Sequence, residues 1–149
     1  MPFSVYTHEK ILELFNGPLE DKIFYFKEKS HAEGSPPHYH IALPINDNEY
    51  ILLVMFTSQV AKIKKFSSIN EKQLELLYEV TPNEFSFLTR DSIIDCNDVK
   101  YWTKEELVNN VSGKMDIFNE NIPLEILDNI KTKIKKSPLV RKKIKKKLL

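Results

Sequence analysis

The chain has 149 residues, of which 42% are hydrophobic and 29% charged, values typical of one soluble globular domain. Its single cysteine, Cys96, excludes an internal disulfide and a multi-cysteine zinc site. No apolar run is long enough for a secretory leader or a membrane-spanning helix, so we expect a cytoplasmic protein without a membrane partner.

The net charge of +1 conceals a strong asymmetry along the chain. Residues 131–149 hold 10 of the 22 lysines and arginines and none of the 21 acidic residues. Residues 1–130 therefore carry 12 basic and 21 acidic side chains, a net charge of −9. A basic block is usually a solvated helix face or chain end, but clustered lysines also bind nucleic acid phosphates by releasing counterions. Composition leaves both interpretations open.

The first third of the chain predicts a helix followed by strands. Residues 4–15 place apolar side chains at helical spacing and predict a short helix that ends at "NGP". Residues 22–29 are rich in aromatic and β-branched types and predict a strand. Residues 38–45 and 49–58 predict two more strands, joined by the turn-forming "NDN". The uninterrupted apolar run at 50–56 predicts a central strand buried on both faces.

The middle of the chain gives weaker patterns. The basic stretch "KIKKF" is expected to be a link, and residues 70–80 predict a short helix. Three short strands are predicted beyond it, at 86–88, 92–96 and 99–102. Thr103 and Glu106 fit the capping box, in which each side chain pairs with the backbone of the other residue, so a helix should begin there.

A second C-terminal helix is predicted from Pro123, because apolar residues from Ile126 to Ile134 form one stripe. Pro138 should end it. The predicted organisation is one domain, 1–149, with four parts: an N-terminal helix extension at 1–20, a core at 22–107, C-terminal helices at 103–136 and a basic tail at 137–149.

Two histidines one residue apart, His38 and His40, are the first candidates for chemistry. On a strand they face the same way, with Cα atoms roughly 7 Å apart. Such a pair can divide acid and base roles near neutral pH. It can also form half of a metal site, whose third ligand would be His31, Glu33 or a distant aspartate. The plainest interpretation is two polar residues on the solvent-facing side of an edge strand, and the pattern alone leaves all three open.

Two hydroxyl residues, Thr57 and Ser58, end the apolar strand. They either cap the exit of the chain from that strand or hydrogen-bond a phosphate. The sequence alone does not decide between capping and phosphate binding.

In order, four stretches resemble the MazF/PemK (Kid, CcdB-like) toxins of bacterial toxin–antitoxin systems, over about residues 22–107. The first is the Gly34 loop that leads into "PPHYHIALPI", and the second is "ILLVMFTS", an apolar strand ending in Thr or Ser. The third and most specific is "LTRDSIIDCNDVKYWTKEEL", and the fourth is a helix near the C-terminus.

The resemblance implies an α+β, mainly β fold: a small, strongly curved antiparallel SH3-like barrel, here with an N-terminal helix and C-terminal helices. It implies an endoribonuclease toxin, usually a homodimer, that cleaves single-stranded RNA without metal or cofactor. The ribose 2′-hydroxyl attacks the adjacent phosphate and leaves a 2′,3′-cyclic phosphate and a 5′-hydroxyl. The expected partners are single-stranded RNA and a cognate antitoxin, either protein or RNA.

The resemblance also assigns residues. The family's catalytic arginine falls on His38, and its Thr or Ser falls on Thr57, with Ser58 beside it. Histidine lacks the fixed charge and bidentate donors of arginine, but it takes and gives protons better at neutral pH. The expected catalytic residues are His38, His40, Thr57 and Ser58. The expected RNA-binding residues are Arg90, Lys62, Lys64, Lys65, Lys142, Lys143 and Lys146.

Two other functions remain open at this stage. The departure from arginine at His38 would also suit a non-catalytic relative that binds nucleic acid or protein. A metal-dependent hydrolase built on the two histidines is the third hypothesis.

Overall fold

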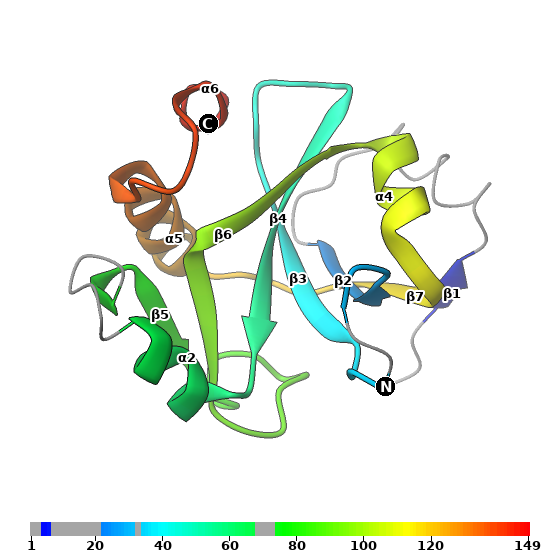
Figure 1. Cartoon of the computed structure of the whole chain (residues 1–149), viewed down its shortest axis with the longest axis horizontal. Coiled ribbons are helices and arrows are strands. Elements are labelled where there is room, and N and C mark those ends of the chain that lie inside the picture. Colours follow the sequence, from blue (N-terminus) through cyan, green and yellow to red (C-terminus); the bar gives the residue numbers. More distant parts are fainter. Residues whose placement is uncertain (1–3, 7–21, 32–33, 68–73) are drawn as a thin grey trace.

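A computed structural model describes residues 4–6, 22–31, 34–67 and 74–149. Over these residues, seven strands form one sheet in the order β1-β7-β2-β3-β4-β6-β5, and every neighbouring pair is antiparallel (Figure 1). The edge strands β1 and β5 do not pair with each other, so the sheet is open across the described residues. The predicted α+β, mainly β class is confirmed.

The strands are β1 (Ser4–Tyr6), β2 (Lys22–Glu28), β3 (His38–Leu43), β4 (Tyr50–Thr57), β5 (Leu77–Val80), β6 (Ser92–Thr103) and β7 (Val111–Asn119). The helices are α2 (Val60–Ser67), α4 (Lys104–Asn110), α5 (Leu124–Lys136) and α6 (Lys142–Lys145). None of the helices in the described ranges has the length and apolar character that crossing a bilayer requires.

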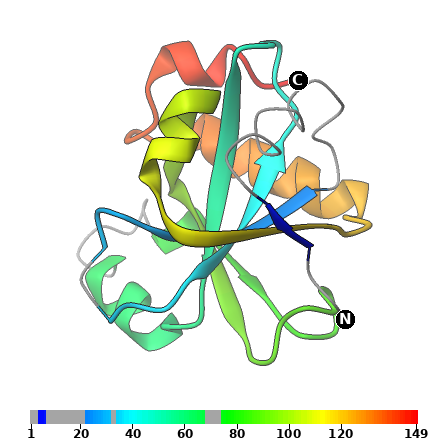
Figure 2. The same cartoon turned by 90° about the vertical axis from the view of Figure 1, so that its right-hand side faces the viewer.

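The centre of the sheet follows its prediction, with β3 and β4 forming a hairpin inside it. β4 is buried on both faces, because its side chains alternate between two apolar cores. Leu52 and Val54 belong to the core that includes α5, whereas Ile51 and Leu53 belong to the core that includes α4. Figures 1 and 2 show α4 and α5 on opposite sides of β4.

β6 is one continuous strand where separate strands were predicted at 92–96 and 99–102. Its pairing with β4 shifts register between Val54 and Phe56, which lets the longer strand bend across the sheet (Figure 1). The strand predicted at 86–88 is wrong, because residues 81–91 form turns. Phe85 and Phe87 in this loop are buried in the core. Their spacing of two residues looks like that of a strand, although the loop pairs with no strand among the described residues.

Two predicted helices differ from the structure over the residues that it describes. Ser4–Tyr6, in the helix predicted at 4–15, forms β1 and pairs with β7; residues 7–15 lie outside the described ranges, as does most of the 1–20 extension. Of the helix predicted at 70–80, residues 74–75 are helical, but Leu77–Val80 forms β5 on the edge of β6. The link "KIKKF" is instead part of α2. At β1 and β5, pairing with a neighbouring strand outweighed a short helical apolar pattern. At α2, the helix propensity of the lysines favoured a helix over a link.

β7 was missed, because the region 103–136 was predicted to be helical. It pairs with β2 from Lys22↔Asn119 to Glu28↔Val111, with a register shift between Phe26 and Lys27. Gly113 lies opposite this shift with φ of 79°, a left-handed conformation that glycine adopts at β-bulges. α4 ends at Asn110 and β7 begins at Val111, so the chain passes directly from helix to strand.

The capping box at Thr103 is present and starts α4 as predicted. Thr103 Oγ1 accepts from the Glu106 backbone N–H at 3.1 Å, and Glu106 Oε1 accepts from the Thr103 backbone N–H at 3.1 Å. We expect Thr103→Ala to lower the free energy of unfolding by about 1 kcal/mol, because it removes one of these two bonds. Urea denaturation measures the loss; Thr103→Ser should restore most of it, and an alanine variant as stable as wild type would contradict the expectation.

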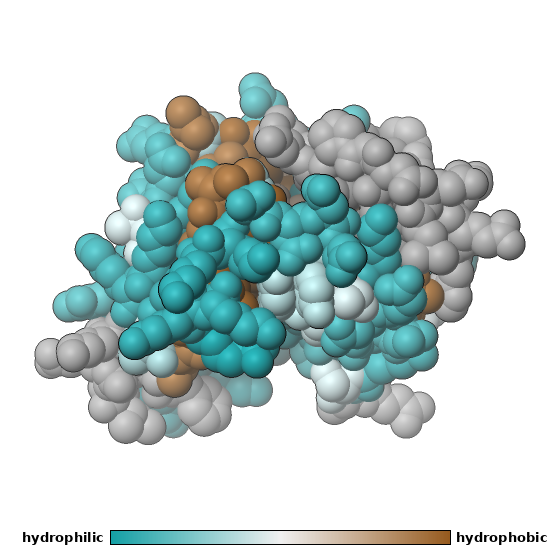
Figure 3. All heavy atoms as spheres, turned by 90° about the horizontal axis from the view of Figure 1, so that it is seen from above, coloured by the Kyte–Doolittle hydropathy of each residue, from teal (hydrophilic) through white to brown (hydrophobic). Residues whose placement is uncertain are grey.

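α5 and the basic tail are ordered around apolar anchors. The α5 stripe Ile126, Ile130 and Ile134 is buried, and the helix ends before Pro138 as predicted. In the tail, Val140 and Ile144 are buried, and the backbone N–H of Asn46 in the β3–β4 turn donates to the Lys147 carbonyl at 2.7 Å. The tail therefore packs on the hairpin. Figure 3 views this end of the molecule, whose surface is largely hydrophilic.

Candidate functional site

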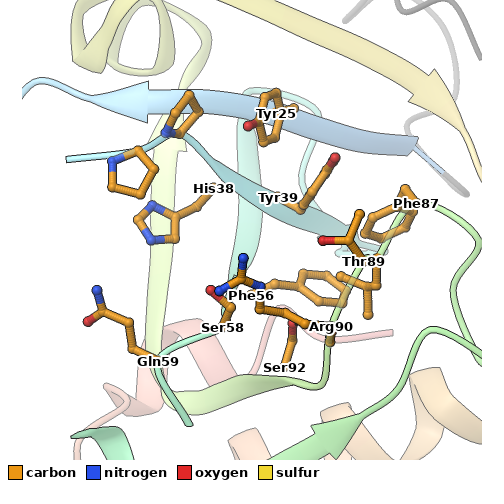
Figure 4. A pocket seen from close by; sticks show the side chains of 13 residues that line it. Tyr25, His38, Tyr39, Phe56, Ser58, Gln59, Phe87, Thr89, Arg90 and Ser92 are labelled. Atoms are coloured by element: carbon orange, nitrogen blue, oxygen red, sulfur yellow. Dashed lines mark hydrogen bonds between the residues drawn. The ribbon is translucent and has the colours of Figure 1, made fainter. Parts of the chain in front are cut away.

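A cavity of about 550 Å³ lies where β3 begins and β4 ends (Figure 4). Antiparallel pairing of β3 with β4 brings these two chain positions to the same end of the hairpin. The loop 81–91 closes the third side. The lining residues are Tyr25, Pro36, Pro37, His38, Tyr39, Phe56, Ser58, Gln59, Phe87, Leu88, Thr89, Arg90 and Ser92.

Three residues predicted from the sequence meet at this cavity: His38, Ser58 and Arg90. His38 is half-buried at the head of β3, whereas Ser58 and Arg90 are exposed. The Arg90 side chain points from its loop across the cavity toward the side that holds Ser58 and His38 (Figure 4). Its guanidinium makes no ion pair with any of the described residues. The cavity thus combines an imidazole, a hydroxyl and an unneutralised fixed positive charge.

His38 is held in a state that favours the neutral ring. Burial lowers its pKa from the ordinary value, the charge of nearby His31 lowers it further, and Glu28 partly opposes both. Its Nδ1 is shielded from solvent and has no hydrogen-bond partner in the described part of the chain. Nε2 is therefore the nitrogen through which His38 can act as a proton acceptor.

His40 lies apart from the cavity. It is 1% exposed, stacks on Phe26 with ring centroids 4.1 Å apart, and places Nδ1 3.3 Å from the Phe24 carbonyl. Burial lowers its pKa to about 3, so the ring is neutral near pH 7. Its interpretation as a solvent-facing residue of an edge strand is wrong, because β3 is internal and both faces of the sheet are covered.

The buried His40 should make stability depend on pH. The unfolded chain binds a proton near the ordinary pKa of 6.5, whereas the folded chain binds it only near 3, so stability falls as pH falls through this window. We expect a slope of about 1.4 kcal/mol per pH unit from this group. Urea denaturation of wild type and His40→Leu between pH 6.5 and 4 measures it: the wild type should lose stability more steeply, and parallel curves would contradict the assignment.

Thr57 and Ser58 have different surroundings. Thr57 is 6% exposed, and its Oγ1 accepts from the Gln59 backbone N–H at 3.2 Å, which caps the exit from β4. It does not line the cavity, whereas Ser58 does. The capping interpretation therefore fits Thr57, and phosphate contact is available to Ser58.

The predicted RNA-binding lysines fall into two groups. Lys62, Lys64 and Lys65 are exposed on α2, which starts two residues after Ser58, and Lys64 pairs with Glu79. The tail lysines, at positions 142, 143 and 146, are also exposed. The tail is hydrogen-bonded through the Lys147 carbonyl to Asn46 in the β3–β4 turn, which joins β4 at the end opposite Ser58. None of these six lysines lines the cavity, but α2 begins directly after the lining residue Gln59.

An aromatic wall of the cavity was missed from the sequence. Tyr25 and Tyr39 are directly opposite in the β2–β3 register, and their ring centroids lie 4.3 Å apart. Tyr39 also contacts Phe87, at 4.5 Å. Both tyrosines are partly exposed, so their rings are available to stack on bases. The only signal in the sequence was that Tyr25 and Tyr39 each lie in a predicted strand; that they face each other follows only from the β2–β3 register.

The described residues hold no cluster of three or more His, Cys, Asp or Glu side chains placed to bind a metal ion. A metal-dependent hydrolase built on His38 and His40 therefore lacks a ligand set in the described part of the chain. No model of a known protein family matches the sequence, and no curated protein matches it. Membership of the MazF/PemK family stays a prediction from the motifs quoted above.

Proposed function

We propose that the protein is an endoribonuclease toxin that cleaves single-stranded RNA by attack of the ribose 2′-hydroxyl, without a metal ion. The observation that carries the proposal is the meeting of His38, Ser58 and Arg90 around one open cavity with an aromatic wall. Proton transfer, phosphate binding and base stacking each have a suitable side chain there.

In the proposed reaction, His38 Nε2 takes the proton of the 2′-hydroxyl while the new bond from that oxygen to phosphorus forms. The bond from phosphorus to the 5′ oxygen breaks, and this oxygen takes a proton from water, which reaches the open cavity. Arg90 stabilises the extra negative charge on the phosphorane, because its guanidinium is exposed and makes no ion pair with the described residues. Ser58 donates a hydrogen bond to a phosphate oxygen. The His38 proton then returns to solvent, so the protein ends unchanged.

Binding of RNA draws on the surfaces around the cavity. The tyrosine pair offers stacking surface to unpaired bases, which favours single strands over a duplex. Residues 1–130 carry a net charge of −9 and repel RNA, so local positive charge must compensate. Arg90 supplies it at the cavity, and the exposed lysines of α2 supply it on the helix that begins beside the cavity. The tail lysines, on another end of the molecule, would act as a second phosphate-binding surface or dock an acidic antitoxin segment.

The SH3-like barrel and the homodimer belong to the same proposal. Two register shifts, in the β2–β7 and β4–β6 pairs, are features that increase twist and bending in a sheet. They support a strongly curved sheet of the MazF/PemK kind. The cytoplasm is the expected location, and a cognate protein or RNA antitoxin is the expected partner.

Expression in a bacterial host tests the proposed activity. The wild type should arrest growth and fragment cellular RNA, and His38→Ala should relieve both effects at equal protein level. RNA binding without cleavage would favour the non-catalytic alternative, which the replacement of the family's arginine by His38 also fits. A wild-type protein that is harmless and leaves RNA intact would contradict the proposal.

A further inference from the structure

A cluster of charged and titratable side chains that do not line the cavity lies next to His38. Glu28 is 8% exposed at the end of β2. Its Oε2 lies 3.4 Å from His31 Nε2 and 3.4 Å from Lys100 Nζ, a residue of β6. The His31 ring meets the His38 ring edge-on, with centroids 5.5 Å apart. Glu28 therefore connects His31, whose ring contacts His38, with a lysine on β6, a strand that does not neighbour β2 in the sheet.

The charged and titratable groups around His38 come from several elements. Glu28 and His31 come from β2 and the turn after it, His40 from β3 itself, and Lys100 with its ion-pair partner Asp98 from β6. Arg90 faces it across the cavity. Lys100 and Glu28 are both almost fully covered, with side chains 11% and 10% exposed, so this pair is weakly screened by solvent. The His31 side chain, at 26%, is more accessible.

We propose that His31 and Glu28 are positioning residues for His38: Glu28 anchors the His31 ring, and His31 holds His38 edge-on and unprotonated as the proton acceptor of the site. This inference rests on the proposed function. Because His31 and Glu28 do not line the cavity, they act through His38 and not on the RNA.

The two residues act on His38 with opposite electrostatic signs. A protonated His31 forms an ion pair with Glu28 and repels a second proton on His38, only 5.5 Å away ring to ring. Glu28 attracts that proton, but Lys100 at the same oxygen offsets the attraction. These directions agree with the pKa of His38, which burial lowers most, His31 and Lys100 lower further, and Glu28 raises. The sequence suggested that His40 would be the partner of His38. Because His40 is buried apart from the cavity, His31 is the histidine that takes this place.

Substitutions of the accessible member, His31, test the proposal on the full chain. His31→Asn removes the charge and should move the His38 titration midpoint, followed by NMR of its ring, upward by about 0.5 pH unit or more. His31→Lys fixes the charge and should leave the midpoint at or below the wild-type value. The acid limb of the pH profile of RNA cleavage should move with each midpoint. A folded Glu28→Gln variant should move both the His38 midpoint and the acid limb of the cleavage profile to lower pH.

Identical His38 midpoints in wild type, His31→Asn and His31→Lys would overturn the inference, as would a cleavage profile that loses height without moving along the pH axis. The NMR readout needs no activity. Midpoints that move in a protein that leaves RNA intact would contradict the proposed function while preserving the link between His31 and His38. The two failures are therefore distinguishable.

Discussion

Replacing His38 with alanine is expected to lower the rate constant for RNA cleavage by about 100- to 10,000-fold. The imidazole is the only side chain lining the cavity that takes protons near neutral pH, since the other lining residues in the described ranges are aromatic, apolar, amide, hydroxyl or arginine. RNA affinity should change little, because stacking and Arg90 remain. Single-turnover cleavage of a labelled single-stranded RNA, together with a binding titration, separates the two quantities.

Far-UV circular dichroism and the denaturation midpoint must show that the His38→Ala variant is folded. His38→Arg is the informative companion, because it restores the residue that the resemblance assigns to this position and exchanges proton transfer for fixed charge. We expect the cleavage rate of His38→Arg no longer to fall as the pH is lowered, because arginine stays protonated throughout this range. An alanine variant that cleaves at the wild-type rate would remove His38 from the reaction.

Arg90→Ala is expected to lower the rate of cleavage by about 100- to 1,000-fold, the usual effect of removing one group that stabilises transition-state charge. Unlike the His38 change, it should also weaken RNA binding and reduce its dependence on salt, since a phosphate contact is lost. Arg90→Lys should recover part of the binding but little of the rate, because lysine lacks the bidentate fork. Cleavage and binding at several salt concentrations measure these effects.

Arg141→Ala is a matched control, because Arg141 is exposed on the tail and does not line the cavity. Its cleavage rate should stay within about twofold of the wild type, as is usual for a surface change away from the site. Equal losses in the Arg90 and Arg141 variants would mean that general positive charge matters and that the cavity has no special role.

The central hairpin and the α4 cap were predictable because their signals are local. The uninterrupted apolar run of β4, its turn and the box at Thr103 and Glu106 each lie within a few residues. β1, β5 and β7 were not predictable, because they are defined by partners far along the chain. β7, for instance, pairs with β2 across roughly 90 residues, as the register Lys22↔Asn119 shows.

The site was partly predictable for the same reason. His38 and Ser58 were found from neighbouring motifs, and the fold then brought Arg90 beside them from a loop. The separation of His38 from His40 was not visible, because alternation places both on one face without telling how deep each lies; their burial depends on the β2 and β4 neighbours. The roles of His31 and of the Tyr25–Tyr39 pair depend on cross-strand register and turn geometry.

The central claim is that the cavity at His38 cleaves RNA by 2′-hydroxyl attack. The most direct test incubates purified wild type and His38→Ala with a mixed-sequence single-stranded RNA in the presence of a chelator, and identifies the new ends by mass spectrometry. The account predicts fragments with 2′,3′-cyclic phosphate and 5′-hydroxyl ends from the wild type alone. RNA that remains intact with the wild type, or equal cleavage by both proteins, would contradict it.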